Sequence, residues 1–142
     1  MNLARTIKEW LHPKEICVTQ ELGRQGEEAA RQFLEKAGLS FLCANYRGQR
    51  GEIDLIFKHR GVLIFVEVKS RTSKSWTRPA AAVDSKKQRR LSRTALQYLR
   101  QCGNPEVTVR FDVVEVLTTD RKIIEVRHIE DAFPLAHPFR YG

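Results

Sequence analysis

An uninterrupted apolar run, Val62 to Val66, is the feature that most limits how this chain can fold. Its residues are mostly β-branched or aromatic and do not alternate with polar ones. We therefore expect a strand that is buried on both faces, near the centre of a sheet. No apolar run in the chain is longer, and a run of this length is too short for a helix that spans a membrane. The sequence predicts a protein that does not act in a membrane.

Two charged residues, Glu67 and Lys69, end this strand. Because a strand has a period of two residues, their side chains project from the same face, about 7 Å apart along the strand. Charges at the end of a buried strand are costly unless they are paired or bind an ion. A structural ion pair is the simpler interpretation of Glu67 and Lys69, and an ion-binding site is the alternative.

A second acid is expected close to Glu67. Three segments rich in β-branched and aromatic residues predict a three-stranded antiparallel meander: 41–47, 52–58 and 62–69. The turn at 58–61 joins the second and third of these strands, and pairing about it places Asp54 opposite a position near 65–67. Asp54 and Glu67 can therefore share one locality.

The other elements complete a mixed sheet. Periodicity and capping residues predict a helix over 22–37 closed by Gly38, a helix from Asp84 or Ser85 to Cys102, and strands at 107–117 and 122–129. We also expect a short amphipathic helix at 3–11 and a long connection at 70–83. The order αβββαββ predicts an α/β fold, a mixed β-sheet flanked by helices, with a short N-terminal helix before it.

The positive charge of the chain is confined to one stretch. The formal net charge is +8, yet residues 58–100 hold twelve Lys and Arg residues and only two acids, a net charge of +10, so the remainder carries −2. Such a block indicates either binding to a polyanion such as nucleic acid or a merely solvated basic face.

The two carboxylates acquire a possible role in this setting. Asp54 and Glu67 would supply oxygen ligands to Mg²⁺ or Mn²⁺ in a site that acts on a phosphodiester, with substrate phosphate and water completing the shell. Lys69 would stabilise developing negative charge or orient the attacking water. Glu27, on the first helix, is a candidate third carboxylate, and the alternative for Glu27 is a solvated acid that the helix dipole favours.

The helix over 85–102 divides its charges between two sides. Lys87 and Gln88 fall on the same side as the apolar residues, which suggests that the beginning of this helix borders a wet cleft. Trp76, in the long connection, could stack on a base or could pack as a lid. The candidate nucleic-acid-binding residues are Arg71, Lys74, Trp76, Arg78, Lys86, Lys87, Arg89 and Arg93.

Several motifs in the chain resemble those of the bacterial YraN family. They are Gly23-x-x-Gly26-Glu27-x-x-Ala30, Asn45-Tyr46-Arg47, Gly51-Glu52-Ile53-Asp54-Leu55-Ile56, Phe65-Val66-Glu67-Val68-Lys69-x-Arg71, Lys87-Gln88 and Arg110-Phe111-Asp112-Val113-Val114. The resemblance implies a restriction-endonuclease-like fold, close to archaeal Holliday-junction resolvases, within the PD-(D/E)xK nuclease superfamily. It covers about residue 20 to Phe133. The expected organisation is an N-terminal amphipathic extension at 1–20, a nuclease-like domain at 21–133 and an irregular tail at 134–142.

The resemblance also implies roles for individual residues. Asp54 matches the motif aspartate, Glu67 and Lys69 match the E-x-K pair, and Glu27 matches a helix-borne glutamate that often joins the metal site. Lys87 and Gln88 match a helix position that often assists the site, so Gln88 joins Asp54, Glu67 and Lys69 as a candidate catalytic residue. One departure from the superfamily pattern is Ile53, which stands where that pattern has proline.

The expected function is that of a Mg²⁺- or Mn²⁺-dependent endonuclease in the cytoplasm, acting on nucleic acid and in particular on branched DNA. The alternative is a non-catalytic nucleic-acid-binding module with a vestigial nuclease site. A third hypothesis is a protein-interaction domain that uses the N-terminal helix. Resolvase-like proteins act on two strands as dimers, so a homodimer is also expected.

Overall fold

A computed structural model describes residues 25–72, 83–120 and 122–141. The helices are α3 (Gln25–Lys36) and α4 (Ser85–Gln101). The strands are β1 (Ser40–Arg47), β2 (Glu52–His59), β3 (Val62–Thr72), β4 (Thr108–Thr119) and β5 (Lys122–Phe133). The predicted helix at 3–11 and the candidate residues Lys74, Trp76 and Arg78 lie outside the described residues.

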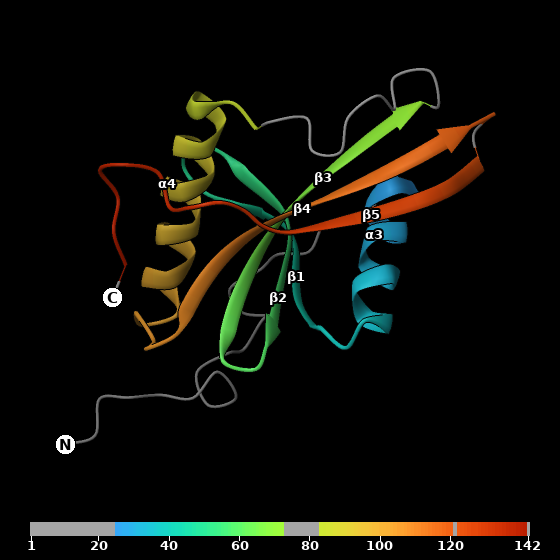
Figure 1. The fold of residues 1–142 in the computed structure, drawn as a ribbon. Coiled ribbons are helices and arrows are strands. Elements are labelled where there is room, and N and C mark those ends of the chain that lie inside the picture. Colours follow the sequence, from blue (N-terminus) through green and yellow to red (C-terminus); the bar gives the residue numbers. More distant parts are fainter. Residues whose placement is uncertain (1–24, 73–82, 121, 142) are drawn as a thin grey trace.

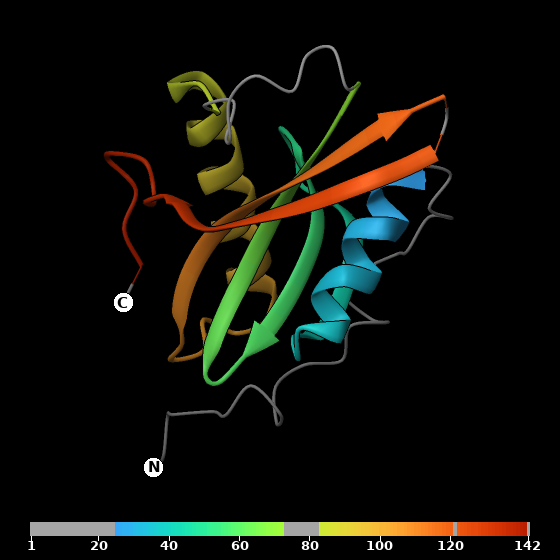
Figure 2. The same ribbon diagram turned by 45° about the vertical axis from the view of Figure 1, so that its right-hand side comes forward.

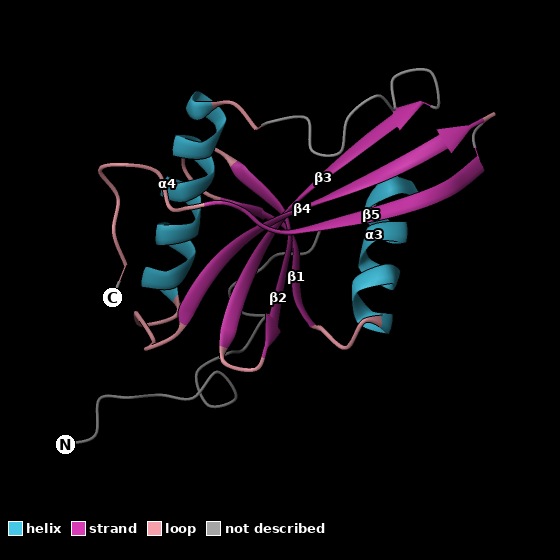
Figure 3. Ribbon diagram, viewed as in Figure 1, coloured by secondary structure: helices cyan, strands magenta, loops and turns pink. Residues whose placement is uncertain are grey.

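The five strands form one mixed sheet in the order β1-β2-β3-β4-β5 (Figure 1). β1, β2 and β3 are the predicted antiparallel meander, β4 runs parallel to β3 after the crossover through α4, and β5 returns antiparallel to β4. Figure 3 shows one helix on each face of this sheet, and the turned view in Figure 2 agrees. The predicted α/β class is confirmed. In the described parts of the chain, neither helix is long and apolar enough to cross a membrane.

β3 is the central strand and is buried on both faces, as its apolar run predicts. Leu63 and Phe65 belong to the core beneath α4, whereas Ile64 and Val66 belong to the core beneath α3. All four side chains are at most 1% exposed. Successive side chains of β3 thus point alternately into the two cores. The polar residues that follow Val66 continue this alternation, so each lies on one of the two faces of the sheet.

α4 begins and ends where its capping residues indicate. Asp84 is the N-cap, and its carboxylate accepts a hydrogen bond from the backbone N–H of Lys87 at 2.8 Å, which satisfies a donor of the first turn. Leu91, Ala95 and Tyr98 are buried against the sheet, as predicted. The N-terminal turn of α4 is consequently fixed beside Glu67 of β3, which Lys87 contacts.

Apolar periodicity predicts that α3 buries Gly26, Ala30, Phe33 and Ala37, with Leu34 alongside. This prediction is confirmed at Ala30 and Leu34 and is wrong at Phe33. Glu27, Ala30 and Leu34 are buried, whereas Phe33 is 39% exposed. The structure therefore turns Glu27 inward, which contradicts its interpretation as a solvated acid. A Cβ atom on Gly26 would overlap the hydroxyl oxygen of Ser70 in β3, so glycine lets α3 approach the sheet closely at this point.

Two strands extend three or more residues beyond their predicted ends. β3 continues through Ser70 to Thr72 because parallel pairing with β4 extends to Thr72 and Thr118, although these last residues are polar. β5 continues to Phe133, which pairs with Phe111 beyond an irregularity in the ladder. Apolar periodicity ends before either extension, so backbone pairing with a neighbouring strand is what sustains them.

Candidate active site

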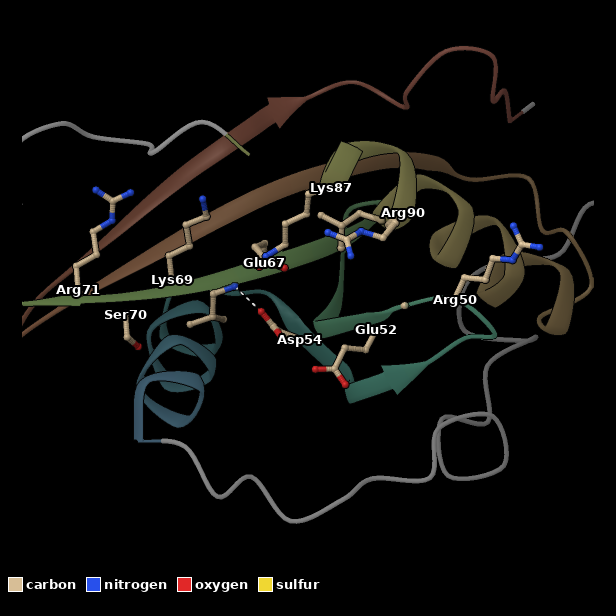
Figure 4. A pocket seen from close by; sticks show the side chains of 12 residues that line it. Arg50, Glu52, Asp54, Glu67, Lys69, Ser70, Arg71, Lys87 and Arg90 are labelled. Atoms are coloured by element: carbon tan, nitrogen blue, oxygen red, sulfur yellow. Dashed lines mark hydrogen bonds and ion pairs between the residues drawn. The ribbon is translucent and has the colours of Figure 1, made fainter. Parts of the chain in front are cut away.

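The site lies where β2 and β3 separate. The last residue pair of their ladder is Leu55 with Val66, so the next position brings Asp54 beside Glu67, as the turn arithmetic predicts. Beyond this pair, an Asp54 carboxylate oxygen (Oδ2) accepts the backbone N–H of Val68 at 2.8 Å (Figure 4). The Asp54 side chain thus accepts a hydrogen bond that a backbone oxygen of β2 would accept in a regular ladder.

The alternation of β2 breaks at Asp54. Ile53 and Leu55 are two residues apart and would share a face in a regular strand, yet Ile53 packs in the core beneath α4 and Leu55 in the core beneath α3. On β1, Asn45 lies between the partners of these two residues and has a φ of 52°, in the left-handed region. This local rotation of the strand pair places Asp54 at the opening instead of inside either core.

We call the place where β2 and β3 separate, at Asp54 and Glu67, the fork. Three of the described acids are buried there. Asp54 is 9%, Glu67 8% and Glu27 6% exposed. Burial and then the charge of Glu67 raise the pKa of Asp54 from 3.8 to about 7, with Glu27 and Glu52 adding to the rise and the Val68 hydrogen bond opposing it. The fork is therefore strongly unfavourable for a second negative charge unless a cation is present.

Two lysines accompany Glu67. The Lys87 ammonium, from the first turn of α4, lies 2.5 Å from an oxygen of Glu67. Burial, then the charge of Lys87, lowers the pKa of Lys69, and the charge of Glu67 opposes this shift. Lys69 projects on the same side of β3 as Lys87 (Figure 4). The structure thus brings together Asp54, Glu67, Lys69 and Lys87, which sequence reasoning grouped.

A pocket of about 570 Å³ opens over these residues (Figure 4). Five cationic and three acidic side chains line it, and the acids cluster at the fork. The lining residues are Arg50, Gly51, Glu52, Asp54, Glu67, Val68, Lys69, Ser70, Arg71, Lys87, Arg90 and Leu91. The pocket is a cationic cleft with a small acidic centre, which suits a polyanion whose backbone must meet a metal ion.

Sequence reasoning missed Arg50 and Arg90 among the lining residues. Arg50 comes from the β1–β2 turn, which docks on α4 because the backbone N–H of Gln49 donates to the side chain of Gln97 at 2.9 Å. A Cβ atom on Gly48 would come within 2.6 Å of the same side-chain oxygen, so glycine permits this docking. For Arg90 a signal existed, because it follows Lys87 by three residues on the helix.

Other predicted residues lie away from the pocket. The side-chain amide of Gln88 donates to the backbone oxygen of Val83 at 2.8 Å, and Gln88 does not line the pocket. Lys86, Arg89 and Arg93 are exposed on the side of α4 opposite its core face. The Arg93 guanidinium lies over the ring of Phe139, 5.7 Å from its centroid. The roles predicted for these four residues stay predictions.

The predicted metal ligands do not form a closed cage. Among the described residues, no group of three or more His, Cys, Asp or Glu side chains is arranged to hold a metal ion. Glu27 contributes charge at Asp54 but does not line the pocket. The direct candidates for metal ligands are therefore Asp54 and Glu67.

Comparisons with known proteins agree with the motifs. The model of "Uncharacterised protein family UPF0102" matches residues 26–116. A "UPF0102 protein" of Desulfosudis oleivorans is 44% identical over 113 residues, which cover 80% of this chain and 92% of that protein. Similar proteins of Symbiobacterium thermophilum and Coxiella burnetii are 42% identical, over 82% of this chain and 98% of the relative, and 41% identical, over 80% and 94%. The match spans α3, the meander with Asp54 and Glu67, α4 and most of β4, so the chain belongs to family UPF0102, which is the YraN family.

Proposed function

We propose that this protein is a metal-dependent endonuclease that hydrolyses phosphodiesters of nucleic acid, with branched DNA as the first candidate substrate. The observation that carries the proposal is the fork at Asp54 and Glu67, where two buried carboxylates meet beneath cationic walls. A protein gains nothing in stability from a buried carboxylate whose charge is opposed by its neighbours. Such an arrangement is explained when the acids bind a cation.

The chemistry of the fork fits Mg²⁺ or Mn²⁺. Asp54 and Glu67 would hold the ion through carboxylate oxygens, and Glu27 would add negative charge from behind. Mg²⁺ is commonly held by only one or two carboxylates together with water and substrate phosphate, so a closed cage of protein ligands is not required. When bound, the ion would polarise a phosphoryl oxygen and make bound water more acidic.

The cationic residues would orient the substrate. Lys69 projects into the pocket from the position after Val68, where its ammonium would orient the attacking water or stabilise negative charge that develops on the phosphate. Arg50, Arg71 and Arg90 would hold phosphates of the strand on either side. Two such sites in a homodimer would allow cleavage of two strands, which is part of the proposal.

The second candidate is a nucleic-acid-binding module whose nuclease site is vestigial. The contact that favours it is the 2.5 Å ion pair between Lys87 and Glu67, in which a side chain already supplies the cation that Glu67 needs. Under this alternative, Lys87 and Glu67 stabilise the fold and the cationic pocket binds phosphates without chemistry.

Cleavage assays distinguish the two candidates. The full chain, Asp54→Asn and Lys69→Ala are incubated with four-way-junction, flap, duplex and single-stranded DNA in Mg²⁺ or Mn²⁺. We expect cleavage by the wild type and a loss of about 10³-fold in each variant, because each removes a group used in the transition state. Asp120→Asn, the same chemical change in the exposed β4–β5 turn, is the matched control and should cleave normally.

The outcomes are separable. Cleavage that persists unchanged in Asp54→Asn and Lys69→Ala contradicts the assignment of the site. Absence of wild-type cleavage, together with DNA binding that weakens steeply with salt, supports the binding module instead.

A further inference from the structure

A buried acid outside the fork contacts the basic side of the pocket. Glu115, in β4, is 0% exposed, and its backbone pairs with Lys69 of β3 on one side and with Arg127 of β5 on the other. Its carboxylate lies 3.4 Å from the Nε atom of Arg71. Sequence reasoning assigned no role to Glu115. A fully buried carboxylate beside the cations Lys69 and Arg71 of β3 requires an explanation beyond packing.

Arg71 is held by β4 at both its side chain and its backbone. The Glu115 carboxylate forms an ion pair with Nε, although this oxygen makes no hydrogen bond within the described part of the chain. The backbone oxygen of Arg71 accepts a hydrogen bond from the hydroxyl of Thr118 at 3.2 Å. The Arg71 side chain is 18% exposed and lines the pocket. A guanidinium has two terminal amino groups beyond Nε, so an arginine held through Nε can still present a bidentate face to a phosphate.

Arg71 and Lys69 lie on the same side of β3, two residues apart (Figure 4). The corresponding separation along a strand is about 7 Å, which lets the two cations serve neighbouring phosphates of one nucleic-acid strand. Lys69 is next to the fork, and Arg71 lies farther along β3. Arg71 is therefore placed for the phosphate that flanks the one at Asp54 and Glu67.

We propose that Glu115 is a positioning residue that holds Arg71 in place to bind this flanking phosphate. The inference rests on the proposed function for the identity of the polyanion, but it concerns binding and not the chemical step. Because Glu115 is itself buried, it would act on the phosphate through Arg71 and not by direct contact. Its negative charge also offsets part of the repulsion among the cations that surround it.

The competing explanation is that Glu115 only compensates charge. If so, Glu115→Gln would raise the local positive charge and strengthen binding to DNA, and Arg71 would contribute equally whether or not Glu115 is present. If Glu115 positions Arg71, the contribution of Arg71 to binding depends on Glu115. A double-mutant cycle measures this dependence directly.

The experiment measures DNA binding by the full chain, by fluorescence anisotropy without a catalytic metal ion, across a series of salt concentrations. The variants are Arg71→Gln, Glu115→Gln and both together. We expect Arg71→Gln to weaken binding about fivefold in the wild-type background and to lower the salt slope by about one. In the Glu115→Gln background the same change should cost less than about twofold.

Glu125→Gln provides the matched control. It removes the same charge from β5, where Glu125 contacts Arg127 and not Arg71. Arg71→Gln should keep its full cost in the Glu125→Gln background. If Glu115→Gln does not fold, as judged by thermal melting, Glu115→Asp replaces it, because the shorter side chain keeps the charge but withdraws it from Arg71.

An equal cost of Arg71→Gln with and without Glu115 overturns the inference, as does a wild-type protein that binds no DNA. DNA binding with the expected cycle but without cleavage supports the inference and contradicts only the proposed nuclease activity. Cleavage of DNA, together with equal costs of Arg71→Gln in both backgrounds, supports the nuclease activity and contradicts the role of Glu115.

Discussion

Two buried aspartates in the same sheet differ in how fully their charge is satisfied. Asp112, in β4, is 0% exposed, and its carboxylate accepts two hydrogen bonds from Arg110 and one from the backbone N–H of Asp131. His128 lies 2.7 Å from the same carboxylate. Asp54, by contrast, has one backbone hydrogen bond and three nearby glutamates.

The pKa values of the two groups diverge accordingly. Burial opposes ionisation of Asp112, but the contacts with His128, Arg110 and Asp131 outweigh it and lower the pKa of Asp112. Burial and the charge of Glu67 instead raise the pKa of Asp54 to about 7. This is the difference expected between a structural carboxylate and, under the proposed function, one that binds a cation.

The largest expected effect concerns Asp112. Asp112→Asn should reduce the free energy of unfolding by about 4 kcal/mol, because an amide cannot replace a buried carboxylate that pairs with the partly buried guanidinium of Arg110. Chemical denaturation of the full chain measures this change, and Asp120→Asn serves as its exposed control. A loss below about 1 kcal/mol would show that Asp112 contributes little to stability and would contradict the distinction between the two aspartates.

The second prediction concerns the stability of Asp54→Asn. Since the folded pKa of Asp54 lies above the value of 3.8 in a model peptide, the folded state binds the proton more tightly. The Asp54 contribution to stability therefore decreases as the pH rises from about 4 to 7. At pH 8 with a chelator present, Asp54→Asn should have a higher melting temperature than the wild type. Its free energy of unfolding should be larger by at least about 1 kcal/mol, the equivalent of one pKa unit.

This gain should disappear near pH 3, below the model value of 3.8, where Asp54 is mostly protonated in both folded and unfolded chains. Melting curves at both pH values check the prediction. A wild type that is more stable than Asp54→Asn at pH 8 without metal would show that Asp54 is structural, like Asp112.

The smallest expected effect comes from the pocket wall. Arg50→Gln and Arg90→Gln should each weaken DNA binding about threefold and lower the salt slope by about one, since each would remove one phosphate contact. Arg89→Gln, on the opposite side of α4, is the comparison. If Arg89→Gln weakens binding more than the other two variants, the exposed stripe of α4 and not the pocket holds the nucleic acid.

Short connections explain which parts of the site the sequence could predict. A tight turn joins β2 and β3, so counting outward from it placed Asp54 beside Glu67, and the period of β3 placed Lys69 on the same face as Glu67. Capping chemistry likewise located Asp84 at the start of α4 and hence Lys87 near the site. Each inference needed only local geometry.

The features that sequence reasoning missed depend on contacts between distant segments. The pairing of Lys69 with Glu115 follows from the parallel register of β3 and β4, which no turn fixes because α4 lies between them. Arg50 reaches the pocket only because its turn docks on Gln97 of α4. The burial of Glu27 runs against hydrophobic periodicity, which favoured the exposed Phe33. Tertiary packing decided all three.

Direct metal binding tests the central claim that the fork at Asp54 and Glu67 is kept for a divalent cation. Mn²⁺ is titrated into the full chain at pH 8, and unbound Mn²⁺ is measured by electron paramagnetic resonance. We expect one Mn²⁺ per chain in the wild type and in Asp120→Asn, and affinity at least about 100-fold weaker in Asp54→Asn and Glu67→Gln. Equal Mn²⁺ binding by the wild type and Asp54→Asn would contradict this claim.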